Sequence, residues 1–328
     1  MYFIMDIVCY LSLVGIFLVM SPDRNKPSVV IICGPTGIGK TTVAIEAAKI
    51  FNAEILSSDS MQIYRHMDIG TAKPTHEEQA AVPHYMIDIV DPDELFDAEK
   101  FAKKAHDKIL QLYARGITPF VAGGTGLYIK ALIHGLFKAP SSHDARERLK
   151  AEAAIHGTGF LYKRLCKCDP DAAEKIHPND AYRITRALEI YEITGKTISE
   201  YHRAHRFLHN RYNVLKVGIY MKRKDLYSRI DKRVDAMIAA GFVDEVEKLM
   251  GMGYSRDLKS MRSIGYRHII DFIRGTLSCE EMLRTLKRDT RRYAKRQMTW
   301  FRADSEIVWV EAGRVNEICS LIQKFLQV

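Results

Sequence analysis

The chain has 328 residues, of which 47% are hydrophobic and 27% charged, so it can bury a sizeable core in one large domain or two smaller ones. Its formal net charge of +9 favours a polyanionic partner such as nucleic acid, although solubility alone is an alternative explanation. The six cysteines lack C-x-x-C pairs and the density of a secreted disulfide framework, which also argues against a zinc site. We therefore expect a cytoplasmic protein.

The N-terminal segment is apolar between residues 7 and 19, which is short for a membrane span, and no basic residues precede it. Met20 stands directly before a polar linker that leads to the first predicted strand. We expect residues 1–27 to be an apolar extension and linker, and we favour an upstream extension over a membrane anchor.

The next part of the chain alternates strand and helix patterns. Strands are predicted at 29–33, 54–56 and 118–122, and helices at 42–51 and 98–113. Such alternation builds a parallel sheet covered by helices.

After Pro140 the pattern changes to helices without strands, at 144–154, 160–167, 172–175 and 180–194. The strand pattern returns at 214–220 and 307–310, with helices between them at 225–240, 242–250, 266–274 and 279–301. We therefore assign residues 28–140 and 212–312 to the core and residues 141–211 to a helical insertion. Residues 313–328 are expected to form a C-terminal helix.

A glycine-rich loop follows the first strand and opens the first helix. It consists of Gly34, Pro35, Thr36, Gly37, Ile38, Gly39, Lys40 and Thr41, and it matches the phosphate-binding consensus at every fixed position. Its glycines let backbone N–H groups point at phosphate oxygens, while Lys40 and the Thr41 hydroxyl serve phosphate and Mg²⁺. We predict an α/β fold with a P-loop NTPase-like parallel sheet and an all-α insertion, in which these eight residues bind a diphosphate or nucleotide.

Asp59 follows the second predicted strand and is flanked by serines, which places a carboxylate at the same edge of the sheet as the loop. It could bind Mg²⁺, take a proton, or cap the next turn. A usual ATPase has a second carboxylate at the end of a long hydrophobic strand, and no such run is evident. We interpret the segment 86–91 as a structural strand and turn.

Two further polar loops, at 68–74 and 123–128, could either meet a ligand or serve as turns. Arginines also share helical faces, Arg183 with Arg186 and Arg229 with Arg233, where they could hold phosphate or pair with nearby acids.

Two basic segments suit a nucleic acid. Arginines flank a glycine at 262–267 and could clamp a nucleic-acid backbone. The helix at 279–301 has a basic face with Tyr293, Trp300 and Phe301 beside it, which favours a structured RNA bound through its phosphates over a merely solvated face.

Seven motifs in order resemble those of one family, the bacterial-type tRNA dimethylallyltransferases, also called tRNA isopentenyltransferases. They are the loop 34–41, the segments 57–60, 68–74 and 123–125, His177–Asp180 with Arg183 and Arg186, the segment 262–267, and Ala294–Gln297 with Thr299 and Trp300. The resemblance extends from residue 29 to residue 309.

The resemblance implies transfer of the dimethylallyl group from dimethylallyl diphosphate to the exocyclic amine of the adenosine 3′ of the anticodon in tRNA. Asp59 matches the general base, and Thr36, Lys40 and Arg233 match catalytic positions around the diphosphate. Mg²⁺ is the implied cofactor, with Thr41 as its protein ligand, and we expect a monomer.

The resemblance also implies positions that contact tRNA, with the helical insertion gripping the anticodon arm. These are Asp59, Ser60, Met61, Gln62, Thr125, Arg148, Tyr182, Arg183, Ile184, Thr185, Arg186, Arg262, Ser263, Ile264, Gly265, Tyr266 and Arg267.

Three other functions compete with this interpretation. A nucleotide kinase or ATPase explains the loop but neither the basic helix nor the insertion. A prenyltransferase of free adenine nucleotides should be shorter, and a non-catalytic RNA-binding protein has no need of Asp59 beside a diphosphate site.

Overall fold

A computed structural model of the chain describes residues 23, 25–205 and 211–327. The apolar run at 7–19 lies outside the described residues. Within them, no helix is both long and apolar enough to cross a membrane.

The centre of the molecule is one parallel sheet in the strand order β3-β2-β4-β1-β5-β6, which confirms the predicted fold class. The strands are β1 (Ser28–Cys33), β2 (Ala53–Ser57), β3 (His84–Tyr85), β4 (Thr118–Gly123), β5 (Asn213–Tyr220) and β6 (Ile307–Glu311). Because all strands are parallel, their carboxyl ends meet at one edge of the sheet, where ligands of such folds bind.

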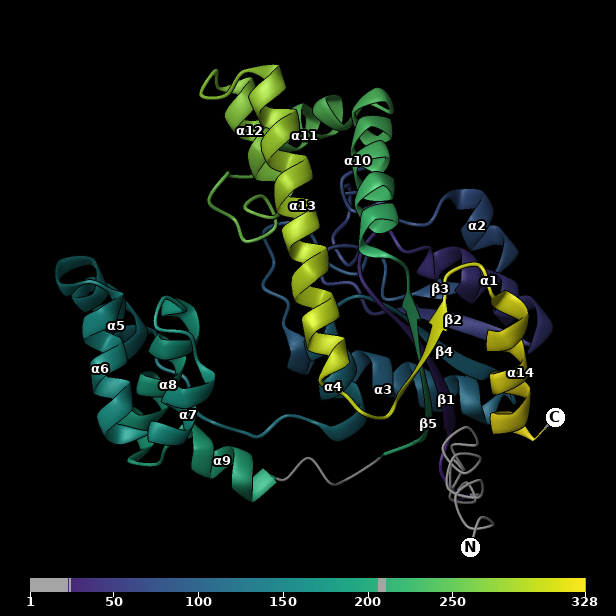
Figure 1. Cartoon of the computed structure of the whole chain (residues 1–328), viewed down its shortest axis with the longest axis horizontal. Coiled ribbons are helices and arrows are strands. Elements are labelled where there is room, and N and C mark those ends of the chain that lie inside the picture. Colours follow the sequence, from purple (N-terminus) through teal and green to yellow (C-terminus); the bar gives the residue numbers. More distant parts are fainter. Residues whose placement is uncertain (1–22, 24, 206–210, 328) are drawn as a thin grey trace, which may run out of the picture.

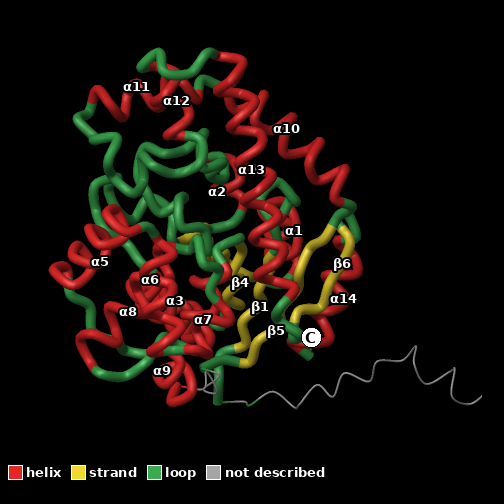
Figure 2. The backbone as a smooth tube through the Cα atoms, turned by 60° about the vertical axis from the view of Figure 1, so that its left-hand side comes forward, coloured by secondary structure: helices red, strands yellow, loops and turns green. Residues whose placement is uncertain are grey.

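Helices cover both faces of this sheet (Figures 1 and 2). In β1, Val29 and Ile31 face α3 (Ala98–Ala114) and α4 (Gly126–His134), whereas Val30 and Ile32 pack with α1 (Lys40–Ile50) and α14 (Val315–Leu326). The run of β-branched residues in β1 is therefore apolar at every position because both faces are buried.

Five of the described helices between β4 and β5 form a group of their own, which stands beside the sheet in Figure 1. They are α5 (His143–His156), α6 (Thr158–Cys168), α7 (Pro170–Lys175), α8 (Ala181–Thr194) and α9 (Ile198–His205). Leucines 149, 161, 165 and 188 and Ile184 make up most of their separate core. The Asp180 side chain caps α8 by accepting from the Arg183 N–H.

Four helices rise above the carboxyl edge of the sheet: α10 (Arg223–Ala239), α11 (Phe242–Gly251), α12 (Tyr266–Ile273) and the long α13 (Cys279–Arg302) (Figure 1). Ion pairs tie α13 to α10, from Arg291 to Asp231 at 2.6 Å and from Lys287 to Asp235 at 2.6 Å. Part of the basic face of α13 is therefore neutralised by α10.

Of the strand and turn predicted at 86–91, the strand is wrong and the turn is present. This part of the chain pairs with β2 only at His84–Tyr85, just before the predicted strand, and then makes an isolated bridge from Val90 to Tyr64. Met86 and Asp88 have φ angles of +63° and +53°, which a strand does not accommodate. A short helix, α2 (His76–Ala81), and α9 were not predicted.

Candidate active site

The glycine-rich loop 34–41 joins the end of β1 to the start of α1, in the strand-to-helix context that the sequence predicts. Gly37 has a φ of +78°, and a Cβ there would lie 3.0 Å from the Ile230 side chain of α10. Glycine suits this position, because an L side chain would be strained at this φ and would press on the Ile230 side chain.

Lys40 is the first residue of α1, and its Nζ donates to the Pro35 carbonyl at 2.8 Å. Burial lowers the pKa of Lys40 to about 8, and the nearby Asp59 carboxylate opposes this shift. The loop thus holds a lysine whose positive charge is disfavoured by burial and favoured by the Asp59 carboxylate.

Asp59 lies just beyond the end of β2, beside the loop. Its Oδ1 accepts the Met61 N–H at 2.8 Å, which fixes the orientation of the carboxylate. The turn that the sequence left as an alternative role for Asp59 is therefore present, and the same side chain also lines both cavities of the site.

Two cavities adjoin at this point. One, of about 330 Å³, is polar and is lined by the loop with Lys40, Thr41 and Arg229. The other, of about 280 Å³, is lined mainly by apolar side chains of α10, α13 and the segment before α12. The walls of both include Thr36, Gly37, Asp59, Thr71 and Arg233. A molecule with a charged and an apolar end could therefore lie across the boundary.

Arg233 reaches this boundary from α10. Its Nη1 donates to the Thr36 Oγ1 at 3.3 Å. Burial lowers the pKa of Arg233 and Asp59 raises it, yet a guanidinium stays protonated in proteins. Arg233 is thus a fixed positive charge facing both the loop and Asp59.

Comparison with known proteins shows which proteins this chain is similar to. The family described as IPP transferase matches residues 62–304. A tRNA dimethylallyltransferase of Desulfosudis oleivorans is 50% identical over 305 residues, covering 92% of this chain and 97% of the relative. The chain belongs to the tRNA dimethylallyltransferase family.

Solved structures of the family share the fold as well. The tRNA isopentenylpyrophosphate transferase of Bacillus halodurans superposes with a TM-score of 0.69 at 42% identity, covering 92% of this chain and 97% of that one. A eukaryotic dimethylallyltransferase acting on tRNA gives a TM-score of 0.71 at 29% identity, covering 87% and 74% of the two chains.

Several residues predicted to contact tRNA gather around the apolar cavity. Ser60, Met61 and the segment 263–265 line it. Thr125 lies next to them, because its Oγ1 accepts the Ser60 N–H at 3.1 Å. Gln62 is buried and its amide donates to the Ala72 carbonyl at 3.0 Å, so this side chain holds the loop 68–74 in place.

Other predicted contacts lie on the insertion helices, away from these cavities. Tyr182, Arg183 and Arg186 line a groove of about 920 Å³ there. Arg148 makes an ion pair with Glu192 at 2.5 Å. Ile184 and Thr185 are buried in the helical group, main chain included, so these two predicted contacts do not lie on the exposed surface of the structure.

The segment 262–267 is held by acids. Arg262 pairs with Asp257 at 2.8 Å and Arg267 pairs with Asp289 at 2.7 Å. Tyr266 is 1% exposed, and its hydroxyl donates to Glu245 at 2.7 Å. The Tyr266 side chain therefore serves packing, and the two arginines are the charged groups that this segment presents.

Sequence reasoning missed two residues that organise the site. Gln297 of α13 accepts the Thr36 N–H at 2.8 Å and donates to the Gly124 carbonyl at 2.9 Å, which joins the loop 34–41 to the end of β4. Glu245 of α11 accepts the N–H groups of residues 68, 69 and 70 as well as the Tyr266 hydroxyl. Gln297 lies in a family motif, which was the available signal, whereas nothing in the sequence around Glu245 distinguishes it from a surface acid.

Replacing Glu245 with Gln should destabilise the protein. Both carboxylate oxygens act as acceptors, so an amide NH₂ would face N–H groups and at least one hydrogen bond would be lost. We expect a loss of about 1–3 kcal/mol and a fall in Tm of roughly 2–10 °C, measured by calorimetry. Glu247→Gln, on the exposed side of the same helix, is the control. Equal Tm values for the two variants would contradict the assigned role of Glu245.

The affinity for inorganic diphosphate should fall as the pH rises above about 8. The pKa of Lys40 in the folded protein, about 8, lies below the ordinary value of 10.5, so about half of the ammonium is lost at pH 8 and the rest above it. Between these two values the unfolded chain binds more protons, so this group makes stability rise with pH while diphosphate binding weakens.

Calorimetric titration with inorganic diphosphate from pH 7 to pH 10 checks this. Kd should rise by up to tenfold per pH unit above pH 8 in the wild type. Lys40→Arg should show a flatter profile, because its charge does not titrate in this range. A wild-type profile parallel to that of Lys40→Arg would show that Lys40 stays protonated throughout.

Proposed function

We propose that this protein transfers the dimethylallyl group of dimethylallyl diphosphate to the exocyclic amine of the adenosine immediately 3′ of the anticodon in tRNA. The observation that carries the proposal is the common wall of the two cavities, where Asp59, Thr36 and Arg233 face both the phosphate loop and the apolar cavity. The relatives named above, which are tRNA prenyltransferases by name, support the same activity.

The diphosphate belongs in the polar cavity. The backbone of the loop, Lys40 and Arg233 present positive charge and N–H groups to it, and Thr36 lies between them. The prenyl chain then extends toward the apolar side, past Met61, Ile230 and Met237. This arrangement holds the allylic carbon at the boundary, beside Asp59.

The reaction exchanges one bond for another at that carbon. The C–O bond breaks and its electron pair leaves with the diphosphate, whose growing charge Lys40 and Arg233 stabilise. The adenine amine forms the new C–N bond and loses a proton to Asp59, which passes it to solvent. An adenine amine is a weak nucleophile, so the base must first be flipped from the anticodon loop into the apolar cavity.

The residues present fit a magnesium ion held mainly by diphosphate oxygens. The described residues contain no group of three or more His, Cys, Asp or Glu that could hold a metal without substrate. Thr41 lines the polar cavity and is the protein hydroxyl suited to such an ion. Bound there, Mg²⁺ would neutralise charge on the leaving diphosphate.

The competing functions fit less well. The two strands next to β1 in the sheet end without a carboxylate, β4 in Ala122 and Gly123 and β5 in Ile219 and Tyr220, so neither supplies the second carboxylate of a usual ATPase. A free nucleotide has no use for the basic groove on the insertion helices.

The direct test supplies labelled dimethylallyl diphosphate, Mg²⁺ and unmodified tRNA to the purified protein. We expect labelled tRNA, with the label on the adenosine 3′ of the anticodon. Label that enters AMP in place of tRNA, or phosphate release from ATP alone, would show that one of the competing functions is correct.

A further inference from the structure

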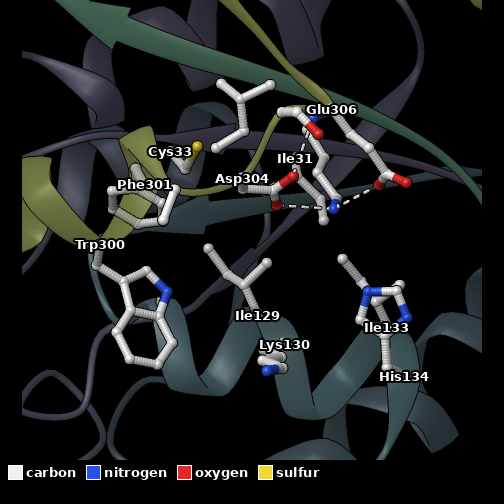
Figure 3. A pocket seen from close by; sticks show the side chains of 15 residues that line it. Ile31, Cys33, Ile129, Lys130, Ile133, His134, Trp300, Phe301, Asp304 and Glu306 are labelled. Atoms are coloured by element: carbon white, nitrogen blue, oxygen red, sulfur yellow. Dashed lines mark hydrogen bonds and ion pairs between the residues drawn. The ribbon is translucent and has the colours of Figure 1, made fainter. Parts of the chain in front are cut away.

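A third cavity, of about 460 Å³, lies over β1 and β5, between α4, the end of α13 and the start of β6. Figure 3 shows the Trp300 indole at one end and His134 at the other, with Ile129 between them and Asp304 and Glu306 on the facing wall. None of the residues proposed above for diphosphate binding or proton transfer lines it. We call it the Trp300 cavity.

Helix α13 connects the Trp300 cavity with the reaction site. Tyr293, Gln297 and Trp300 are spaced i, i+4 and i+7, so they lie along one face of the helix. Tyr293 lines the apolar cavity that receives the target base, which we call the reaction cavity. Gln297 binds the phosphate loop, and Trp300 lines the Trp300 cavity. The helix rises about 10 Å over these seven residues. A strand of RNA with one base in the reaction cavity can therefore reach the Trp300 cavity with a neighbouring base.

On its other side, the Trp300 cavity borders the insertion groove. Lys130 of α4 lines both of them. The groove also presents Lys175, Arg183, Arg186 and Arg203, a set of cations suited to RNA phosphates. The Trp300 cavity thus lies between the part of the protein that suits the RNA backbone and the part that modifies the base.

The lining of the Trp300 cavity suits a base better than a phosphate. Trp300 is 47% exposed, and its Nε1 edge packs against Gly126, where a Cβ would lie 2.1 Å from it. Asp304 and Glu306 hold Lys216 at 2.8 Å and 2.7 Å, so the opposite wall is acidic and carries no unbalanced cation from Lys216. Lys130 and His134 also line the cavity, but the aromatic ring and the two carboxylates favour stacking of a base over binding of a phosphate.

We propose that the Trp300 cavity binds an unpaired nucleobase of the anticodon loop that neighbours the target adenosine, stacked on the Trp300 indole. This inference rests on the proposed function. It assigns to Trp300 a binding role that holds the loop open while the target base occupies the reaction cavity.

A cycle of protein and RNA changes tests the pairing. The substrates are an intact anticodon stem-loop and two stem-loops with an abasic nucleotide on the 5′ or the 3′ side of the target. On the intact stem-loop, Trp300→Ala should lower kcat/KM roughly ten- to a hundredfold, the range expected for one base stacked on an aromatic ring. On one of the two abasic stem-loops, Trp300→Ala should lower kcat/KM less than twofold. On the intact stem-loop, Trp300→Phe should retain most of the wild-type activity.

Fluorescence gives a reading that is independent of activity. The protein has two tryptophans, so Trp309→Phe leaves Trp300 as the only indole. Binding of the intact stem-loop should quench its emission, and the abasic stem-loop identified by the cycle should not. In the activity measurements, Tyr113→Ala is the control for loss of an exposed aromatic side chain. Tyr113 is also 47% exposed but lies near the end of α3, before β4.

The outcomes separate the two proposals. If the wild type does not prenylate tRNA, the proposed function fails. If the wild type does prenylate tRNA, two results would show that the assignment of the Trp300 cavity is wrong. One is that Trp300→Ala lowers kcat/KM by the same factor on all three stem-loops, and the other is that the Trp300 emission does not change when the intact stem-loop binds.

Discussion

Asp59→Asn should lower the rate of prenyl transfer by about 10²- to 10⁴-fold, the usual contribution of a positioned general base, without weakening diphosphate binding. The asparagine oxygen can still accept the Met61 N–H, so the turn stays in place. Asp59 raises the pKa values of Lys40 and Arg233, so its removal lowers both. At about pH 6, below the lowered pKa of Lys40, both cations stay charged and have lost a competing anion, so affinity for diphosphate measured there should be equal or higher.

Single-turnover transfer to tRNA, together with calorimetric titration of inorganic diphosphate, separates chemistry from binding. Asp107→Asn, which removes an exposed carboxylate on α3, is the control and should retain the wild-type rate. A loss of activity in Asp59→Asn that is explained wholly by a higher Kd would show that Asp59 acts in binding and not as the base.

The sequence predicted the phosphate loop and the parallel sheet because local signals agree there. The run Val29–Cys33 is apolar at every position, as a strand buried on both faces must be, and a glycine loop follows it directly. The strand predicted within 86–91 was wrong because the apolar residues of this segment also suggest a strand. Left-handed conformations at Met86 and Asp88 turn the chain away, and neither residue type signals such a conformation strongly.

The parts of the site that could not be predicted depend on contacts between distant segments. Gln297 binds the N–H of Thr36, which lies 261 residues earlier in the chain. Glu245 binds the loop at 68–70 across about 175 residues. Neither partnership leaves a local pattern, because a buried amide or carboxylate is placed by the packing of whole helices. The sequence also did not predict the contact between Ser60 and Thr125, which a hydrogen bond joins.

The apolar cavity depends equally on packing that the sequence conceals. A Cβ at Gly70 would lie 2.3 Å from the Phe242 ring and 2.7 Å from the Tyr266 ring. The loop 68–74 can therefore approach α11 and α12 only with glycine at this position, and Glu245 then holds it there. This wall of the apolar cavity thus joins the loop 68–74 to two helices that come about 170 residues or more later in the chain.

Arg233→Ala should lower kcat by about 10²- to 10³-fold, the range measured when one donor to a developing negative charge is removed. Arg233 faces both cavities and donates to Thr36, so it lies where charge builds up on the departing diphosphate. Its pKa is lowered by burial, which means that the folded protein disfavours this charge. Removal of the guanidinium should therefore leave Tm unchanged or raise it, as expected for a side chain kept for activity at a cost in stability.

Rates of prenyl transfer at saturating substrate, together with Tm by calorimetry, test this prediction. Lys232→Ala removes an exposed positive charge from the neighbouring position of α10 and should change neither value appreciably. Because Lys232 points to solvent, its charge is screened, whereas Arg233 acts in a partly enclosed cavity. A parallel loss of Tm and activity in Arg233→Ala would mean that Arg233 supports the fold of α10 against the loop, and that charge stabilisation in the reaction falls to Lys40 and the backbone N–H groups.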